Sequence, residues 1–133
     1  MEKQFRLLSV DDQPRARQSL SALLVIDFPQ IIIFEASTGK EALHQVKTFS
    51  PDIVVMDVLM PEGDGIEVTR LLKSMHPQNK IILYSMYSEY QSAALSAGAD
   101  AFITKGEPSK TLIATIAALI KPKSDSTLTH KRE

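Results

Sequence analysis

Five polar residues that could do chemistry together each follow a short apolar run of the sequence. Open α/β sheets bind their ligands at the carboxyl ends of parallel strands, so strand-forming runs would bring all five side chains to one edge. Three carboxylates, one hydroxyl and one ammonium would form a site for a divalent cation and a phosphoryl group. The residues are Asp11 and Asp12 after 5–10, Asp57 after 53–56, Ser85 after 81–84 and Lys105 after 101–104.

The spacing of apolar residues predicts the elements that would position these side chains. Short runs rich in β-branched residues indicate strands, whereas apolar residues three or four positions apart indicate helices. Prolines mark several helix ends, and Gly98 is expected just after a helix C-cap. Strands are expected over 5–10, 31–34, 52–56, 80–84 and 101–104, and helices over 14–27, 38–49, 66–75, 90–97 and 108–120.

Five strands that alternate with five helices predict a doubly wound parallel α/β sheet, (βα)5, with helices on both faces. Order 2-1-3-4-5 is one of two common strand orders for such sheets, and periodicity alone does not decide between them. The 133 residues favour one domain, expected over 4–121, followed by a polar tail or the start of a linker over 122–133.

Composition excludes several classes of protein. A net charge of −1 argues against a broad nucleic-acid-binding surface, and the absence of cysteine excludes disulfides and thiolate metal sites. No apolar stretch approaches the roughly 20 residues that a membrane span needs, and the first residues show no signal-peptide pattern. A cytoplasmic location without a membrane partner is therefore expected.

This set of residues resembles the receiver domain of two-component response regulators. The likeness covers residues 4–121 and includes Met60-Pro61 and Asp64-Gly65 after the aspartate at 57, in addition to the five polar residues. The spacing from Lys105 to Pro108, with the segment 97–102, resembles receivers attached to helix-turn-helix (LuxR-like) DNA-binding domains. The resemblance implies a flavodoxin-like sheet of order 2-1-3-4-5 and a signalling switch rather than an enzyme.

The resemblance also implies roles for individual residues. Asp57 would accept a phosphoryl group from a sensor histidine kinase, with Mg²⁺ required. Asp12 and Asp57 would be direct Mg²⁺ ligands, with Asp11 helping and the backbone carbonyl of Leu59 supplying a further oxygen. Ser85 and Lys105 would contact phosphoryl oxygens, and Phe102 would be the switch aromatic.

Partners follow from the same resemblance. A receiver homodimer is possible through the face of 90–97, 101–104 and 108–120, or through the face of 14–27 and 108–120. DNA binding, and with it transcription regulation, would need an output domain outside these 133 residues. Two alternatives stay open: a complete single-domain regulator, or the receiver portion of a longer DNA-binding regulator. Slow loss of the phosphoryl group is also expected, because neither Leu59 nor the bulky Tyr87 would orient an attacking water.

Each feature also has an ordinary structural interpretation. Asp11 and Asp12 could cap the helix over 14–27, and Phe102 could be core packing. Ser85 alone would suggest a loop hydroxyl and Lys105 alone a solvated surface cation, and three scattered histidines lack metal-ligand spacing.

Two other functions have weaker support. An aspartyl-phosphate hydrolase of haloacid-dehalogenase type would need an acidic residue at position 59, where Leu59 cannot transfer a proton. A nucleotide-binding domain would need a Gly-rich phosphate loop, which the turn at 11–14 lacks.

Overall fold

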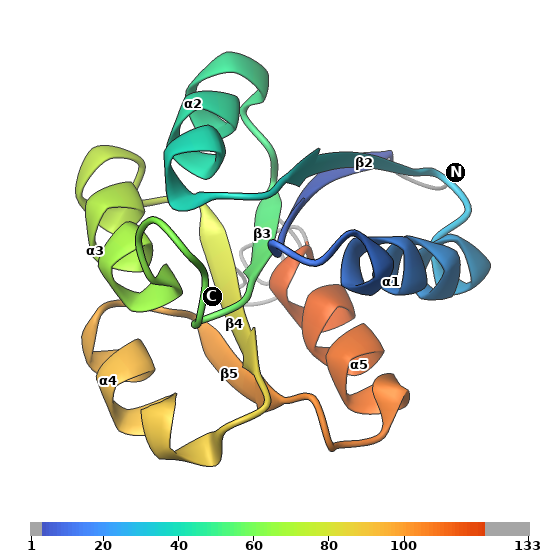
Figure 1. The fold of residues 1–133 in the computed structure, drawn as a ribbon. Helices are drawn as coiled ribbons and strands as arrows, with labels where there is room; N and C mark the ends of the chain where they lie inside the picture. Colours follow the sequence, from blue (N-terminus) through green and yellow to red (C-terminus); the bar gives the residue numbers. More distant parts are fainter. Residues whose placement is uncertain (1–3, 122–133) are drawn as a thin grey trace, which may run out of the picture.

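The computed structural model describes residues 4–121, in which strands and helices alternate along the chain (Figure 1). The expected tail over 122–133 lies outside the described residues. The strands are β1 (Phe5–Val10), β2 (Ile31–Ala36), β3 (Ile53–Met56), β4 (Lys80–Ser85) and β5 (Ala101–Thr104). The helices are α1 (Pro14–Asp27), α2 (Gly39–Phe49), α3 (Gly65–Met75), α4 (Gln91–Ser96) and α5 (Ser109–Leu119), with a 3₁₀ turn, η1 (Ser88–Tyr90), before α4.

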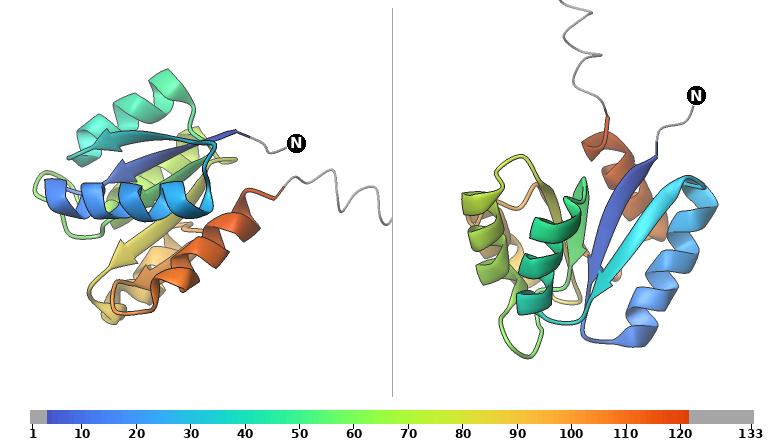
Figure 2. Two further views of the ribbon diagram at one scale, coloured as in Figure 1. Left: turned by 90° about the vertical axis from the view of Figure 1, so that its right-hand side faces the viewer. Right: turned by 90° about the horizontal axis from the view of Figure 1, so that it is seen from above.

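The five strands form one parallel sheet in the order β2-β1-β3-β4-β5, which confirms the predicted fold class and the order 2-1-3-4-5. Helices α1 and α5 cover one face of the sheet, and α2, α3 and α4 cover the other (Figures 1 and 2). The connections between parallel strands place every strand's carboxyl end at the same edge. The edge that the sequence predicts for the site therefore exists as a continuous structural feature.

A separate hydrophobic core lies on each face of the sheet. Alternation along a strand sends successive side chains to opposite faces, so Leu83 belongs to the core under α2, α3 and α4, and Tyr84 packs against the core under α1 and α5. The central strand β3 is buried on both faces, since all four of its residues, 53–56, are at most 2% exposed. Burial of each large aliphatic side chain contributes about 1.5–3 kcal/mol, and this holds the centre of the site edge in place.

Several boundaries differ from the sequence expectation for identifiable reasons. Strand β2 extends to Ala36 and β4 to Ser85 because neighbouring strands pair with these residues, Val10 with Ala36 and Thr104 with Ser85. The helix expected over 90–97 is shorter and follows the 3₁₀ turn η1. Gly98, with φ +108°, follows α4 in the left-handed conformation, as predicted for a residue after a C-cap.

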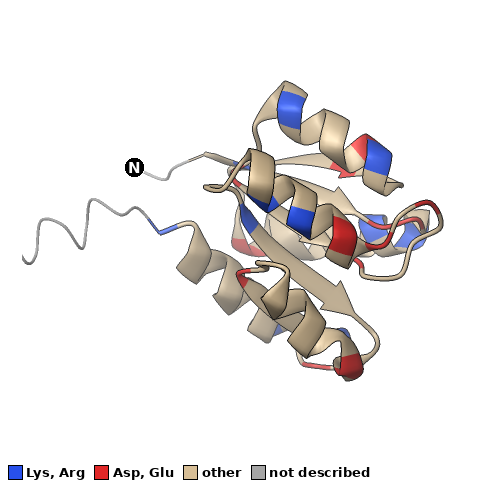
Figure 3. Ribbon diagram, turned by 90° about the vertical axis from the view of Figure 1, so that its left-hand side faces the viewer, with Lys and Arg blue, Asp and Glu red and all other residues tan. Residues whose placement is uncertain are grey.

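Charges of both signs lie on the helices that cover one face of the sheet. On the face of α2, α3 and α4, acidic and basic residues are interspersed along α2 and α3, whereas α4 carries no charged residue (Figure 3). Within residues 4–121, no helix combines the length and the apolar character that crossing a membrane requires.

The start of α3 is packed directly against the end of β3. Asp64 caps this helix by accepting a hydrogen bond from the backbone N–H of Glu67 at 2.9 Å, which confirms a structural role for Asp64. The next residue, Gly65, donates its backbone N–H to the carbonyl of Val58 at 2.7 Å. A Cβ at Gly65 would lie 2.2 Å from the backbone oxygen of Asp57, so only glycine allows this approach.

We therefore expect Gly65→Ala to lower the free energy of unfolding by about 2–3 kcal/mol, because the methyl group must displace the backbone of Asp57. Denaturant unfolding monitored by circular dichroism measures this change. Gly106→Ala is the matched control, since a Cβ there meets no atom within 4 Å, and it should change stability by less than about 0.5 kcal/mol. Equal effects of the two substitutions would contradict the close-approach argument.

Candidate functional site

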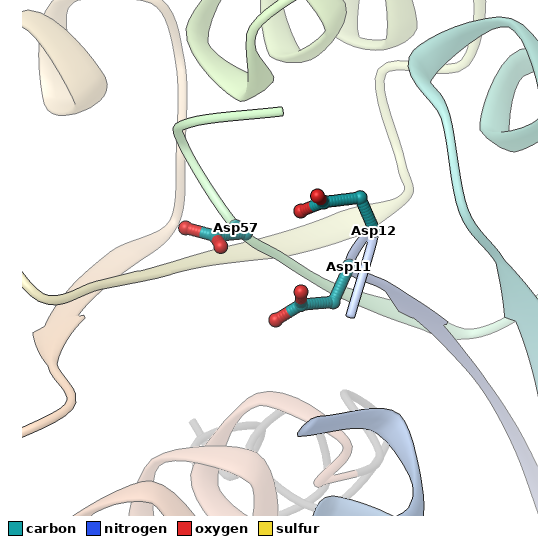
Figure 4. A group of neighbouring side chains, drawn as sticks. All are labelled: Asp11, Asp12 and Asp57. Carbon is teal, nitrogen blue, oxygen red and sulfur yellow. The ribbon is translucent and has the colours of Figure 1, made fainter. Parts of the chain in front are cut away.

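Three carboxylates meet at the carboxyl edge of the sheet (Figure 4). Val10 of β1 pairs with Met56 of β3, so the residues that follow them, Asp11 and Asp57, are neighbours across two adjacent strands. Asp12 completes the group, and one carboxylate oxygen from each residue lies within 4.8 Å of the others. Among the described residues, no other group of three or more acidic or histidine side chains lies close enough together to hold a metal ion.

One ammonium bridges two of the carboxylates. Lys105 Nζ lies 3.1 Å from Asp11 Oδ2 and 3.4 Å from Asp57 Oδ2. The backbone N–H of Lys105 donates to the carbonyl of Ser85 at 2.7 Å, which extends the pairing of β5 with β4 by one residue. Asp11, Asp57 and Lys105, far apart in the sequence, are thus brought together as predicted.

Ser85 closes β4 next to the central strand, and it is buried. Its Oγ accepts a hydrogen bond from the backbone N–H of Tyr87 at 3.1 Å, which fixes the first turn of the loop after β4. The structure places this hydroxyl at the predicted edge of the sheet, and its contact with a phosphoryl group stays a prediction.

The charges at this edge are unevenly compensated. Burial raises the pKa of Asp57 above its ordinary value, the positive charge of Lys105 lowers it, and the neighbouring charge of Asp11 raises it further, with a net upward shift. Burial lowers the pKa of Lys105, but the hydrogen bond that its ammonium donates to Asp11 and the charges of both carboxylates raise it, with a net upward shift. The ammonium is therefore held in its charged form, while the Asp57 carboxylate is costly to keep ionised.

Backbone hydrogen bonds beyond the strand ends hold the acidic residues in place. The N–H of Asp57 donates to Val10 at 3.0 Å, and the N–H of Asp11 donates to Ala36 at 3.1 Å. The guanidinium of Arg17, on α1, donates to the backbone carbonyl of Asp11 at 2.6 Å and forms an ion pair with Glu35 at 2.7 Å. Arg17 therefore supports the acidic loop from outside the sheet.

Sequence reasoning did not identify Arg17, nor Tyr84, whose ring lies 5.6 Å from Lys105 Nζ. A signal for each was present. Arg17 stands one and a half helical turns after the acidic pair, and Tyr84 stands one residue before Ser85, where strand alternation turns its side chain away from the face of Leu83. Neither signal distinguishes a contact with the site from an ordinary surface position.

The remaining predicted residues surround this cluster. Leu59 is 45% exposed and Tyr87 is 51% exposed, in the loops after β3 and β4. The backbone of Leu59 lowers the pKa of Asp57, and a metal-ligand role for the Leu59 carbonyl stays a prediction. Phe102 is half-buried against the core under α2, α3 and α4, so its role as a switch also stays a prediction.

The ordinary interpretations of the acidic pair can be compared with the geometry. The N-cap of α1 is Gln13, so neither Asp11 nor Asp12 occupies the capping position. Instead, Asp11 Oδ1 accepts the backbone N–H of Gln13 at 2.9 Å, which turns the chain into the helix and leaves the other oxygen toward Lys105. Asp11 thus contributes both to the turn and to the charged cluster.

Comparison with known proteins agrees with this geometry. The response regulator receiver domain family matches residues 7–117. The transcriptional regulatory protein LnrK of Bacillus subtilis (strain 168) is 30% identical over 114 residues, covering 84% of this chain and 52% of that protein. A LuxR-family two-component response regulator from Aurantimonas sp. SI85-9A1 has a TM-score of 0.82 at 31% identity, covering 88% of this chain and 85% of that one. TrrA of Thermotoga maritima, solved in complex with Mg²⁺-BeF, has a TM-score of 0.81 at 32% identity, covering 87% and 99%.

The chain belongs to the response regulator receiver domain family, whose members are phosphoacceptor signalling switches. Receiver domains interact with histidine kinases and are signalling proteins rather than enzymes in general. The expected likeness to LuxR-type regulators is confirmed. The chain spans about half the length of the curated relatives it matches.

The raised pKa of Asp57 predicts how stability depends on pH in metal-free buffer. Its contribution to the free energy of unfolding is fully present below the ordinary aspartate pKa and is lost as pH rises through the folded-state pKa. We expect Asp57→Asn to be more stable than wild type at pH 7, because the amide removes the cost of burying a charge, and to lose this advantage below about pH 4. Denaturant unfolding at several pH values measures the difference. Asp27→Asn, at an exposed position, should show no such pH-dependent gain.

Proposed function

We propose that this domain, residues 4–121, accepts a phosphoryl group on Asp57 from a sensor histidine kinase and uses it to change the binding of a partner or output domain. The observation that carries the proposal is the position of Lys105, whose ammonium lies between Asp57 and Asp11 at the carboxyl edge of the sheet. A cation beside a partly buried carboxylate can stabilise negative charge that develops on a transferred phosphoryl group.

The chemistry that these residues support is a displacement at phosphorus. An oxygen of Asp57 forms the new bond to phosphorus, while the bond from phosphorus to the donor's histidine nitrogen breaks and the nitrogen keeps the electron pair. Lys105 donates N–H groups to the phosphoryl oxygens, and the hydroxyl of Ser85 donates to another. The resulting acyl phosphate is a high-energy bond that water can cleave, which suits a temporary signal.

The acidic cluster has the donor set for Mg²⁺. Its ligands would be hard carboxylate oxygens, of which Asp12 and Asp57 are proposed as direct ligands, with Asp11 helping and the Leu59 carbonyl supplying another. Asp12 suits this role because its contact is a long hydrogen bond from Gln13 at 3.4 Å, whereas Asp11 is already paired with Lys105. When bound, Mg²⁺ would supply positive charge that offsets both the clustered carboxylates and the phosphoryl oxygens.

The partner proposals rest on the family. A sensor histidine kinase is the proposed donor, and a role in transcription, with DNA bound by a separate output domain, is supported by the LuxR-family and LnrK likeness. A receiver homodimer through α4, β5 and α5, or through α1 and α5, remains a proposal. Val25 and Ile26, 50% and 75% exposed on α1, offer apolar contact area for the second of these faces. A cytoplasmic location goes with these partners.

The hydrolase alternative is not favoured. An aspartyl-phosphate hydrolase would need a proton-transferring side chain at position 59, and Leu59 has none. We infer that the domain acts as a switch and not as an enzyme that turns over a separate substrate.

The proposal predicts that Asp57 is the phosphorylated residue. Incubation with Mg²⁺ and a small phosphodonor such as phosphoramidate should add the mass of one phosphoryl group to the wild type, and none to Asp57→Asn. Intact-mass measurement checks both. Asp27→Asn, which alters an exposed aspartate at the other end of α1, should label like wild type. Chelation of Mg²⁺ should prevent labelling, and equal labelling of Asp57→Asn would refute the assignment.

Two exposed side chains in the loops after β3 and β4 predict a long-lived phosphorylated form. Leu59 offers no hydrogen bond to an attacking water, and Tyr87 is bulky enough to obstruct its approach. We expect Leu59→Asn to speed dephosphorylation at least about threefold, because an amide can orient the water in line with phosphorus. The decay is followed by intact mass after the donor is removed. Leu71→Asn alters a leucine of similar exposure on α3 and should decay like wild type. Unchanged decay in Leu59→Asn would count against water positioning as the limiting factor.

A further inference from the structure

Lys105 has a third neighbour besides its two carboxylates. The ring centroid of Tyr84 lies 5.6 Å from Lys105 Nζ, within the distance at which the negative face of an aromatic ring attracts a cation. The lysine side chain is only 20% exposed, so water competes weakly for its charge. Tyr84 belongs to β4, and its partner across the sheet, Ile103, stands two residues before Lys105. The ring is therefore fixed to the strand beside the one that carries the ammonium.

The two carboxylates compete for this ammonium. Asp11 lies closer to Nζ than Asp57 does, at 3.1 Å against 3.4 Å, although Asp57 is the proposed acceptor. A lysine stem has four rotatable carbons and no fixed fork of donors, so contacts along the stem and around the nitrogen decide where the charge rests. A tyrosine ring has two side-chain torsions and is held by the sheet, which makes it the more rigid partner.

Open space beside Lys105 makes such a constraint necessary. A cavity of about 220 Å³ lies between α1 and the sheet, and its lining includes Asp11, Asp57, Tyr84, Lys105, Leu20 and Leu23. Without the tyrosine ring this space would enlarge, and the lysine stem could fold toward the aliphatic side chains and away from Asp57. Stems of lysine pack readily along apolar surfaces.

The ring, and not a phenolate, is the attractive group. Burial raises the pKa of Tyr84, the charge of Lys105 lowers it, and the charge of Glu107 raises it, with a net upward shift. The hydroxyl therefore stays neutral at pH 7, and no phenolate forms to pair with the ammonium. Removal of the hydroxyl alone should leave the attraction to Lys105 in place.

We propose that Tyr84 is a positioning residue, whose aromatic ring holds the Lys105 ammonium beside Asp57 for phosphoryl transfer. This inference rests on the proposed function of Lys105 at Asp57. Tyr84 lies on the side of the sheet that α1 and α5 cover. Its role would be to position the ammonium, which neither the acidic cluster nor Ser85 does.

The rate of labelling by phosphoramidate with Mg²⁺ tests the role of the ring. Tyr84→Phe keeps the ring and should label within about twofold of wild type. Tyr84→Leu should label about fivefold more slowly, since a cation–π contact of 0.5–2 kcal/mol corresponds to a range of about twofold to thirtyfold. Phe28→Leu is the matched control, because it removes a half-buried ring from the same core layer and should label like wild type.

Two further measurements separate positioning from packing. In the Lys105→Ala background, Tyr84→Leu should cause no additional slowing, because the ring acts through the ammonium. Phenylalanines with increasing fluorination at position 84 should slow labelling stepwise, since fluorine weakens the negative ring face while packing is nearly preserved. In metal-free unfolding experiments, the effects of Tyr84→Leu and Lys105→Ala should be less than additive.

The outcomes distinguish this inference from the proposed function. If wild type and Tyr84→Leu were labelled at the same rate, the role of Tyr84 would be overturned, and Asp57 would remain the acceptor. An equal loss in Tyr84→Phe, or a flat response to fluorination, would overturn the role of the ring. If wild type took no label, the proposed function would fail, and additive unfolding effects would then overturn the Tyr84–Lys105 contact as well.

Discussion

Repulsion among three carboxylates within 4.8 Å of one another is the interaction that the rest of this structure has to balance. Lys105 supplies one positive charge, which leaves the cluster with an excess of negative charge. The raised pKa of Asp57 is the local sign of this imbalance, because burial and the charge of Asp11 outweigh the ammonium. A site in this condition favours a divalent cation, whose binding relieves the repulsion and in turn favours a further anionic group.

Backbone hydrogen bonds that continue beyond the strand ends hold the repelling carboxylates in place. Asp11, Asp57 and Lys105 each donate a backbone N–H to the neighbouring strand, so the hydrogen bonding of the sheet continues through these three residues. Arg17 anchors the acidic loop from α1, and Gly65 allows α3 to begin in contact with the backbone of Asp57. Like charges are thus held together by groups that carry no part of the phosphoryl chemistry.

The parts of this arrangement that depend on local sequence were predictable, and those that depend on long-range contacts were not. Apolar runs such as Phe5–Val10 and Ala101–Thr104 predicted the strands. The positions just after the strands predicted the five polar residues of the site. Strand order came from the resemblance, because periodicity carries no information about neighbours across a sheet. Strands β2 and β4 end later than predicted because residues of neighbouring strands pair with Ala36 and Ser85.

The supporting residues were beyond prediction for the same reason. Arg17 reaches the backbone carbonyl of Asp11, and Tyr84 reaches the ammonium of Lys105, only because α1 and β4 take particular positions in the fold. A single sequence specifies which face a strand residue occupies, but not which atom of another strand lies opposite it. Contacts of this kind therefore appear first in the structure.

The acceptor strand also connects the two faces of the sheet. On one face the Asp57 carboxylate contacts Lys105, whose ammonium rests against Tyr84. On the other, the Asp57 backbone contacts Gly65, and a Cβ at Gly65 would lie 3.1 Å from Leu83, which is in register with Phe102 on β5. A larger and more negative group on Asp57 would lie next to the ammonium of Lys105 on the first face, and the close packing at Gly65 leaves little room for the Asp57 backbone to shift on the second. Gly65, the first residue of α3, and Leu83 of β4 therefore lie between the acceptor strand and Phe102, the predicted switch residue on β5.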